Sequence, residues 1–513
     1  MSQLKLLFSL MLLISIILVM TMNFQINGKI NHHTLMNINS SDVDKKKMMN
    51  YNNQKRVRVK SNSQCECSSY PNLEIHDDEK LSQILLEAKM EFMKGVVMEK
   101  FNSLDVTLML PVNGTKVWRR GSVNPRKLTY PASCVKLAYL FSSFHWCKNV
   151  KRERIVDCID IHTHPMITWS DNLETGYVVD AISEQLNLYD LNSVNDARFH
   201  SWLEKRNFTM KYLESRNLIG NQIFIAKTYP TNSGQMPIGA EAVQRSFTGP
   251  NAMAPCCAAS LVLQTMYGLE KEETDYAKKL LFHRRFDDWS AIAPALPPGT
   301  LLHNKIGNAY DNINDLVHLV LPNGKEAIVA ILSNGYQRST DSTILARFTE
   351  ILLQKLELLK GLPPIITLTT DSGNARYNTQ EGWIYFNNQT IQTIGKDRIG
   401  NSIVVLPPNQ KVATTLSWDV ELPEDGLYEI TVYTATVETS DGSSQFDVPC
   451  IVNYYPNASS GSTYQTRFST WTKIGDYLLN KGLNKNVVQI QVPLNYPYPV
   501  SVNAIKFSKY PNY

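Results

Sequence analysis

The spacing of apolar residues divides the chain into a first stretch of mixed helix and strand and a second stretch of strands. From Leu81 to Val96, apolar positions recur at helical spacing, which predicts an amphipathic helix over 78–100. Two apolar runs then flank Asn113-Gly114, a dipeptide typical of a tight hairpin turn. The first stretch therefore opens with a helix and two antiparallel strands.

Helical patterns continue to about residue 290. The first stretch then ends with three predicted strands followed by one helix. Strand patterns cover 301–307, 316–321 and 326–332, with the turn signal Asn323-Gly324 between the last two. An amphipathic pattern over 342–360 predicts the closing helix. Because strands at both ends enclose a helical block, we expect an α+β domain whose sheet joins distant segments.

Beyond the break at Gly361-Leu-Pro-Pro364, alternating apolar and polar positions replace the helical spacing. Alternation of this kind is typical of half-buried antiparallel strands, and turn residues recur between the runs. We expect an all-β sandwich. Its predicted strands are 415–422, 427–435, 446–454, 467–474, 487–492 and 500–507.

The N-terminal part of the chain carries an export signal and a tether. An apolar run from Leu6 to Met22 follows Lys5, so residues 1–28 are predicted to be a signal peptide or an uncleaved signal anchor. Residues 29–75 are rich in Asn, Lys and Ser, and we expect a disordered linker there. Both alternatives predict a secreted, extracellular or lumenal protein, with membrane association only if the signal is not cleaved. Five glycosylation sequons agree with export: Asn39, Asn113, Asn207, Asn388 and Asn457.

Composition narrows the class of protein. The 513 residues include 51 Lys+Arg and 47 Asp+Glu, a net charge of +4, and 43% are hydrophobic, which excludes a disordered or fibrous chain. So small a positive charge does not indicate a nucleic-acid partner.

The eight cysteines lack the spacing of structural zinc sites. Cys65 and Cys67 are candidates for disulfide bonds with unassigned partners, and Cys256-Cys257 for packing or one disulfide.

Ser133-Cys-Val-Lys136 is the first segment with candidate chemistry. It precedes an apolar helical run, 137–146, so the hydroxyl and the amine are expected on one helical face. A lysine that burial or a neighbouring cation keeps neutral can accept the serine proton. By itself the pattern is common, and a capping serine beside a surface lysine is then the favoured explanation.

Two further motifs strengthen the catalytic interpretation. Ser170-Asp171-Asn172 precedes another helical run, although all three residues also favour helix caps. Lys305-Ile306-Gly307 ends a predicted strand. The order S-x-x-K, S-D-N and K-x-G resembles that of the penicillin-recognising serine enzymes, above all the class A β-lactamases. The resemblance covers 76–362 and implies a β-lactamase/transpeptidase-like fold, an antiparallel sheet with a helical block.

The resemblance also implies a role for each motif residue. Ser133 would be the acylated nucleophile, and Lys136 its proton acceptor. Ser170 would pass a proton toward the leaving nitrogen, and Lys305 would supply positive potential beside it. The substrate-binding residues are Asn172, which would hold the substrate amide; Gly307; and Asn308, whose backbone N–H would form the oxyanion hole with that of Ser133.

The sequence departs from that family at two points. Ile306 replaces the threonine whose hydroxyl binds a substrate carboxylate, which weakens the case for a β-lactam or D-Ala-D-Ala substrate. Class A enzymes also deacylate with a loop glutamate that activates water. Glu241 is the acidic residue available between Glu214 and Glu270, without the family's flanking pattern. Either Glu241 is the deacylation base or deacylation is slow; we favour slow deacylation.

The C-terminal region resembles the golvesin / xanthan lyase carbohydrate-binding-like domain. The resemblance covers 365–513 and rests on segments such as Pro423-Glu-Asp-Gly-Leu-Tyr428 and Trp471-Thr-Lys-Ile-Gly475. A glycan partner is an expectation from that resemblance. Trp383, Trp418 and Trp471 have the rings for sugar stacking, but aromatic residues at strand spacing more often belong to a core.

These observations predict a serine hydrolase that acts on a small-molecule or peptide-like amide or ester, with a β-lactam as the family default. It would need no cofactor and no metal. An alternative is a catalytically impaired surface protein that binds peptides or glycans, and another is a D-Ala-D-Ala peptidase or esterase-like acyl transferase. Asp160-Ile-His162-Thr-His164 also fits the H-x-H of a metal-dependent amidohydrolase strand, but the later histidines are not followed by the repeating βα pattern that such a barrel needs.

Overall fold

The computed structural model covers the two predicted folded regions. The described residues are 65, 67, 73–94, 103–219, 223–225, 237–283, 290–310, 312–335, 344–370, 372–377, 379–387, 402–434, 445–454, 458–467, 470–497 and 500–511. The predicted signal segment, 1–28, lies outside them, as does most of the predicted linker. So do the sequons at Asn39, Asn388 and Asn457.

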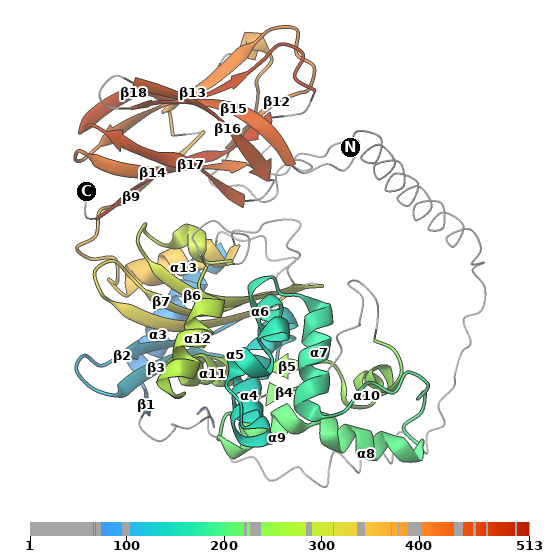
Figure 1. Ribbon diagram of the computed structural model, residues 1–513. Coiled ribbons are helices and arrows are strands. Elements are labelled where there is room, and N and C mark those ends of the chain that lie inside the picture. Colours follow the sequence, from blue (N-terminus) through green and yellow to red (C-terminus); the bar gives the residue numbers. More distant parts are fainter. Residues whose placement is uncertain are drawn as a thin grey trace, which may run out of the picture. The chain divides into compact units, whose positions relative to one another are not determined.

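The first region is built on a six-stranded sheet with the order β1-β3-β2-β8-β7-β6 (Figure 1). Strand β2 pairs antiparallel with both β3 and β8, so the sheet joins segments from the two ends of the region, as predicted. Strand β6 lies at the edge of the sheet. The strands are β1 (Glu74–Asp77), β2 (Ser103–Pro111), β3 (Val117–Val123), β6 (Leu301–Ala309), β7 (Asn312–Val320) and β8 (Glu326–Asn334).

Helices cover both faces of this sheet, so its central strands are buried on both sides. Alternate side chains of a strand point to opposite faces. In β7, Val317 packs with helices α3 (Glu79–Lys94) and α13 (Ile344–Lys355), whereas Leu316 packs with the helical block. In Figure 1 most of that block lies to one side of the sheet. The block contains α4 (Lys136–Trp146), α5 (Ile155–Cys158), α6 (Asp160–Thr168), α7 (Asn172–Ser183), α8 (Ala197–Arg206), α9 (Phe208–Ser215), α10 (Ala240–Thr248), α11 (Pro255–Tyr267) and α12 (Lys271–Leu281), with the small hairpin β4 (Ile223–Phe224) and β5 (Ala252–Met253).

The predicted α+β fold class is confirmed, with differences at element ends. The closing helix was predicted over 342–360, but α13 ends at Lys355, and Glu357 adopts a left-handed conformation with φ 52°. A left-handed residue ends a helix because it breaks the repeat of backbone hydrogen bonds. Helix α3 is described from Glu79 to Lys94, within the predicted 78–100.

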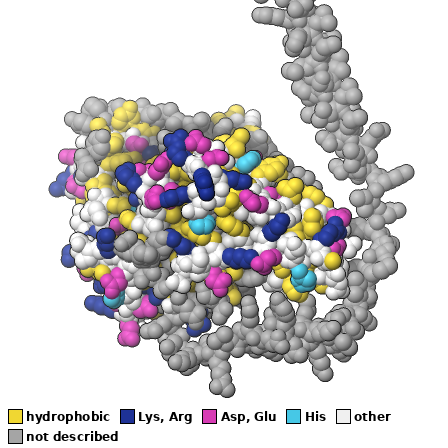
Figure 2. Space-filling view, turned by 60° about the horizontal axis from the view of Figure 1, so that its bottom comes forward, with side chains coloured by type: hydrophobic (Ala, Val, Ile, Leu, Met, Phe, Trp, Pro, Cys, Tyr) yellow, Lys and Arg dark blue, Asp and Glu magenta, His cyan; other side chains and the backbone are white. Residues whose placement is uncertain are grey.

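The described surface mixes charge and apolar area. On the face shown in Figure 2, basic and acidic side chains are interspersed with apolar ones. Of the helices in the described ranges, none combines the length and the apolar character needed to cross a bilayer.

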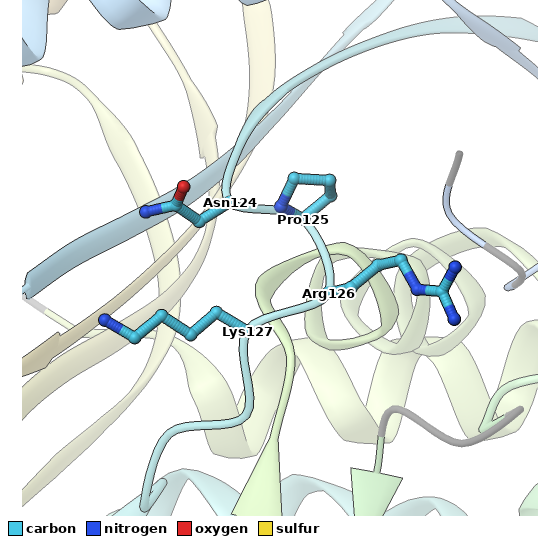
Figure 3. A pocket seen from close by; sticks show the side chains of 4 residues that line it. All are labelled: Asn124, Pro125, Arg126 and Lys127. Atoms are coloured by element: carbon cyan, nitrogen blue, oxygen red, sulfur yellow. The ribbon is translucent and has the colours of Figure 1, made fainter. Parts of the chain in front are cut away.

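A hollow of about 520 Å³ lies at the loop after β3, lined by Asn124, Pro125, Arg126 and Lys127. Figure 3 shows Asn124 and Lys127 pointing to one side and Arg126 to the other. Asn124 donates to the buried carboxylate of Asp105 at 2.7 Å, and the Lys127 ammonium lies 3.6 Å from the same carboxylate. These contacts hold the loop to the sheet, and none of the four lining residues belongs to the predicted catalytic set.

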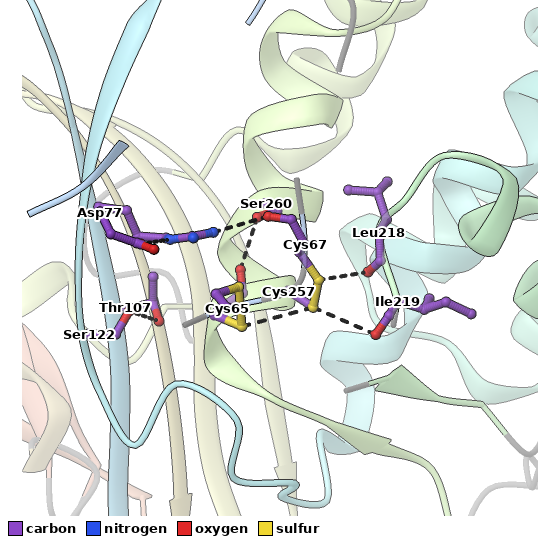
Figure 4. Close-up of a disulfide and its surroundings, with 11 residues drawn as sticks. Cys65, Cys67, Asp77, Thr107, Ser122, Leu218, Ile219, Cys257 and Ser260 are labelled. Atoms are coloured by element: carbon purple, nitrogen blue, oxygen red, sulfur yellow. Dashed lines mark hydrogen bonds and ion pairs between the residues drawn. A yellow bond between two sulfur atoms is a disulfide. The ribbon is translucent and has the colours of Figure 1, made fainter. Parts of the chain in front are cut away.

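Two adjacent disulfides attach the start of the folded region to α11. Cys65 bonds to Cys256 and Cys67 to Cys257, and a third disulfide joins Cys147 to Cys158. Figure 4 shows the cysteine cluster beside Leu218 and Ile219. The first two bonds have sequence separations of 191 and 190, so they close nearly the same loop. The second therefore removes little additional entropy from the unfolded chain.

This arrangement corrects two predictions. The disordered linker was expected to extend to residue 75, but Cys65 and Cys67 are cross-linked and β1 begins at Glu74, pairing parallel with β3. The prediction from composition failed here because the segment has no large apolar run. It is held instead by the pairing of four backbone residues with β3 and by two disulfides. Cys256-Cys257 was expected to form at most one disulfide and forms two.

The C-terminal region contains a β-sandwich, as predicted. One sheet has the order β10-β13-β18-β15-β16 and another β17-β14-β20-β9, and residues of both, such as Trp418 and Phe507, share one core. The two layers are visible in Figure 1. The strands are β9 (Ile365–Thr369), β10 (Ala375–Arg376), β11 (Ile384–Asn387), β12 (Ser402–Leu406), β13 (Thr414–Leu422), β14 (Gly426–Thr434), β15 (Gln445–Tyr454), β16 (Ala458–Arg467), β17 (Thr470–Leu479), β18 (Gly482–Val492), β19 (Val500–Val502) and β20 (Ala504–Lys509).

The three tryptophans considered for sugar stacking are core residues. Trp383, Trp418 and Trp471 are 1%, 0% and 5% exposed. The Trp383 indole N–H donates to the Thr414 hydroxyl at 2.8 Å, and the Trp471 ring contacts that of Tyr433. Because their faces are covered by protein, these rings cannot stack on a glycan.

Candidate active site

Ser133 lies in a tight turn that leads directly into α4. The turn is a 3-10 helix, Ala132–Val135, and the Lys136 backbone N–H donates to the carbonyl of Ser133. The preceding Ala132 has φ 48°, a left-handed conformation that few residues with a Cβ adopt. Such backbone strain is enriched at functional sites. Ser133 and Lys136 thus lie in one continuous helical segment, whose first turn is 3-10 rather than α.

The edge strand β6 meets this turn at Gly307 with no room for a side chain. A Cβ at Gly307 would lie 2.1 Å from the Pro131 carbonyl oxygen and 3.0 Å from the Cys134 backbone nitrogen. The Cys134 thiol donates to the Lys305 carbonyl at 3.1 Å. Asn308 follows Gly307 directly, so the backbone of Asn308 lies at the junction with the Ser133 turn.

Ser170 lies in the turn between α6 and α7. It has φ 55°, and the next residue, Asp171, caps α7 by accepting the Glu174 N–H at 2.9 Å. Of the three residues that were considered as possible helix caps, Asp171 is the N-cap of α7. It leaves the Ser170 hydroxyl and the Asn172 amide to contact other elements.

Two buried lysines converge on the Ser170 hydroxyl. Lys136 is 0% exposed and Lys305 is 2% exposed. The Lys136 ammonium lies 3.2 Å from the Ser170 Oγ, and the Lys305 ammonium lies 2.9 Å from the same atom. Lys136 also donates to the Ser170 carbonyl and, at 2.8 Å, to Asn172 Oδ1. Hydrogen bonds thus join four predicted site residues from α4, the α6–α7 turn, α7 and β6, and the backbone of Lys136 links Ser133 to them.

The pKa values of both lysines are lowered. Loss of hydration on burial and the charge of Lys305 lower the pKa of Lys136 well below its usual value, against an opposing effect of Asp171. Burial lowers the pKa of Lys305 to about 8, with Cys134 and Asp315 acting in the opposite direction. An amine held neutral beside a second, charged lysine is suited to accept a proton.

Ile306 points away from this cluster. It is 6% exposed and packs in the core on the α3–α13 face of the sheet, whereas Lys305 and Gly307, its neighbours in β6, face the Ser133 turn. Alternation along a strand produces this difference. The isoleucine therefore belongs to the core packing in this chain.

A buried carboxylate behind β6 was missed by the sequence reasoning. Asp315, directly opposite Ile306 in β7, accepts hydrogen bonds from Asn304 at 2.7 Å and from the Ala291 backbone at 2.9 Å. Burial raises its pKa to about 6. The sequence did contain a signal for this residue, since Asp315 directly precedes the largely apolar run Leu316–Val320. Buried strands seldom carry a charged residue without a partner.

Glu241 lies in a separate buried ion-pair cluster. It is 2% exposed, and its carboxylate accepts a hydrogen bond from Arg206 at 3.1 Å. Arg206 also forms an ion pair with Asp180. Glu241 contributes to raising the pKa of Tyr139, second to burial, and Tyr139 is one helical turn after Lys136 in α4. Glu241 is thus near α4, with Arg206 as its ion-pair partner.

The histidines of the alternative metal-hydrolase interpretation lie on a helix. His162 and His164 belong to α6, and the His162 ring lies 2.6 Å from the Glu174 carboxylate. The H-x-H of that interpretation required a strand, so it is wrong for this segment.

Comparison with known proteins finds a family model that matches part of the chain. Residues 163–356 match the model of the beta-lactamase enzyme family, a range that includes the Ser170 and Lys305 motifs and begins after Ser133 and Lys136. Golvesin from Dictyostelium discoideum is 28% identical over 366 residues, which are 70% of this chain and 61% of that protein. The match therefore spans less than two thirds of that relative.

Solved structures with a similar chain course are also found. A class A beta-lactamase from Bacteroides cellulosilyticus DSM 14838 is 12% identical, with 54% of this chain and 99% of that chain covered and a TM-score of 0.39. An acyl-enzyme complex of a PBP-A point mutant with penicillin G is 15% identical, with 55% and 98% covered and a TM-score of 0.38. The match to the beta-lactamase enzyme family thus covers residues 163–356, which lie within the α+β region described above.

Proposed function

We propose that the protein is a serine hydrolase that forms an acyl-enzyme on Ser133 with an amide or ester substrate. The observation that carries this proposal is the convergence of the Lys136 and Lys305 amino groups on the Ser170 hydroxyl, with Lys136 lying one helical turn after Ser133. Burying two lysine amino groups around one hydroxyl costs free energy of folding, and a catalytic role would account for that cost.

In the proposed reaction the Ser133 Oγ attacks the substrate carbonyl carbon, and its proton passes to the neutral amine of Lys136. The backbone N–H groups of Ser133 and Asn308 stabilise the oxyanion, a contribution of about 3–4 kcal/mol for one such donor. The proton then passes through Ser170 to the leaving nitrogen or oxygen as the carbonyl–heteroatom bond breaks. Lys305 supplies positive charge beside the substrate, and Asn172 holds its amide.

A slow second step follows from the environment of Glu241. A general base must reach the water that it activates and must keep its lone pairs available. The hydrogen bond from Arg206 occupies one oxygen of this carboxylate. We therefore propose a long-lived acyl-enzyme, with β-lactams as the family's default substrates and transfer to an acceptor other than water as the alternative outcome.

Covalent labelling tests the proposed nucleophile. A fluorescent penicillin and a fluorophosphonate should both label the wild-type protein, and Ser133→Ala should abolish the label. Ser143→Ala is a matched control on the same helix, since the Ser143 hydroxyl donates to the Tyr139 carbonyl. Labelling that persists in Ser133→Ala, or is absent from the folded wild type, would refute the proposal.

Release of the adduct tests the second step. Glu241→Gln should leave the rate of release of a penicilloyl adduct unchanged within about twofold, because the proposal gives this carboxylate no part in deacylation. A fall of 100-fold or more would instead identify Glu241 as the base, as removal of a general base usually costs about 10²–10⁴ in rate.

Ligand binding without turnover is the second candidate function. It is favoured by the engaged carboxylate of Glu241, the acidic residue that the sequence offered for activating water. A protein of this kind would bind a peptide-like ligand and give no covalent label. For either function we propose export from the cytosol, supported by three disulfides and by the exposed sequon at Asn113 in the β2–β3 turn.

A further inference from the structure

We propose that Trp169 and the Tyr130–Tyr310 pair form an aromatic subsite that selects substrates whose acyl group carries a flat apolar ring. The inference rests on the proposed acyl-enzyme chemistry and adds a substrate class to it. It comes from two exposed aromatic side chains, one directly before Ser170 in the sequence and one two residues after Asn308.

Trp169 presents a large apolar surface next to the two lysines. It is 64% exposed, although it is bonded directly to Ser170, whose hydroxyl lies within hydrogen-bond distance of both ammonium groups. The His164 ring packs edge-on against the indole at 5.8 Å. A folded chain usually covers an indole of this size, so its exposure beside the site marks a surface for a ligand.

Tyr310 presents a second aromatic side chain, directly after the end of β6. It follows Ala309, the last residue of the strand, with φ 53° in the turn to β7, and it is also 64% exposed. It is two residues beyond Asn308, whose backbone N–H is assigned to the oxyanion hole. This tyrosine therefore directly follows the strand that holds the proposed oxyanion donor.

Tyr130 supports Tyr310 from the other side of the junction. Their ring centroids are 5.7 Å apart. The Tyr130 carbonyl accepts a hydrogen bond from Asn314 of β7 at 3.0 Å, which fixes the segment three residues before Ser133 to the same strand pair. The tyrosine pair is thus held to the frame that positions the nucleophile.

The chemistry of the two ends of the site determines the class of substrate. The buried lysines bind the polar, charge-bearing end of a substrate. The exposed rings offer flat π-faces, which favour another ring in offset-stacked or edge-to-face packing. An acyl group with an aromatic ring satisfies both ends, whereas a short aliphatic acyl group leaves the rings in water.

Two sulfonyl fluorides that differ by one phenyl group provide the test. Phenylmethanesulfonyl fluoride and methanesulfonyl fluoride both react with an activated serine: the Oγ–S bond forms, the S–F bond breaks, fluoride leaves and Lys136 takes the proton. The quantity compared is the inactivation rate with phenylmethanesulfonyl fluoride divided by the rate with methanesulfonyl fluoride. We expect Trp169→Ala and Tyr310→Ala each to lower this ratio by about 3- to 10-fold. Taking the ratio within each variant cancels general effects on the nucleophile.

Tyr177→Ala is the matched control. Tyr177 is also an exposed aromatic residue, at 46%, but it lies within α7 and its ring contacts His162. We expect its ratio to equal that of the wild type. Ratios in Trp169→Ala and Tyr310→Ala that equal the wild-type value would overturn the subsite while leaving Ser133 as the nucleophile. No modification of Ser133 by either reagent would instead overturn the proposed function.

Discussion

Buried lysines occur in both folded regions, and their surroundings differ. In the sandwich, the Lys509 ammonium pairs with the Glu424 carboxylate at 2.9 Å, and that of Lys506 lies 4.5 Å from the centre of the Trp471 ring. In the first region, Lys136 and Lys305 donate to neutral oxygens of hydroxyl, amide and backbone groups.

This difference provides a way to distinguish a lysine that is buried as part of the fold from one that is buried for catalysis. A lysine that meets a carboxylate or an aromatic face is compensated within the fold. Where two buried lysines share one hydroxyl, burial lowers the pKa of both, and the charge of Lys305 lowers that of Lys136 further. The second arrangement disfavours charge and favours proton transfer, and it identifies the candidate site more strongly than the sequence motifs alone.

The largest expected effect separates the two kinds of lysine. Lys136→Met should lower the second-order rate of fluorophosphonate labelling by about 10²–10⁴-fold, because it removes the proton acceptor. Lys509→Met should leave that rate unchanged. Equal rates in the two variants, measured under conditions where both are folded, would mean that Lys136 is as structural as Lys509.

A smaller loss is expected when the contact between β6 and the Ser133 turn is altered. In Gly307→Ala the new methyl group would lie 2.1 Å from the Pro131 carbonyl oxygen, so the strand must move. Displacement of a catalytic group by about 1 Å can cost 10²-fold, and we expect a loss of about that size in labelling rate. Gly324→Ala is the control: its φ of 79° makes alanine strained there, but no atom lies within 4 Å. It should lower stability and leave labelling intact.

The pH dependence should show the weakened proton affinity of Lys305. Because its pKa is about 8, this lysine loses its charge as pH rises through 8. Labelling by a penicillin, which carries a carboxylate, should then fall about fivefold between pH 8 and pH 9 if it follows the charged fraction. Lys305→Arg, which stays charged, should remove the decline. A flat profile for the wild type to pH 10 would contradict the lowered pKa.

The smallest effect is expected in the sandwich. Glu424→Gln removes the carboxylate partner of Lys509, but Glu424 is 47% exposed, and water screens such pairs. The free energy of unfolding should fall by about 1 kcal/mol or less in denaturant titrations. A loss of several kcal/mol would show that this pair is as tightly coupled to its surroundings as the lysines of the site.

Much of this arrangement was predictable from local sequence. Apolar spacing and turn dipeptides predicted α3, the β2–β3 hairpin and the β7–β8 pair, and the three motifs predicted Lys136, Ser170, Asn172 and Lys305, which the structure brings together. These features depend on residues close in sequence or on a known order of motifs.

The features that were missed depend on distant contacts or on weak local patterns. The pairing of Cys65 with Cys256 and of Cys67 with Cys257 is set by the packing of a segment against α11. Strand β16 was not predicted because Ala458–Arg467 is mainly polar, and it is held by pairing with β15. Asp315 was missed because its partners lie in β6 and in the preceding loop.

Peptide mapping of the protein after stoichiometric labelling tests the central claim most directly. The account predicts one fluorophosphonate adduct per folded chain, on Ser133, formed more slowly when Lys136 is replaced. An adduct on another residue, or a folded chain that stays unmodified at Ser133, would contradict it.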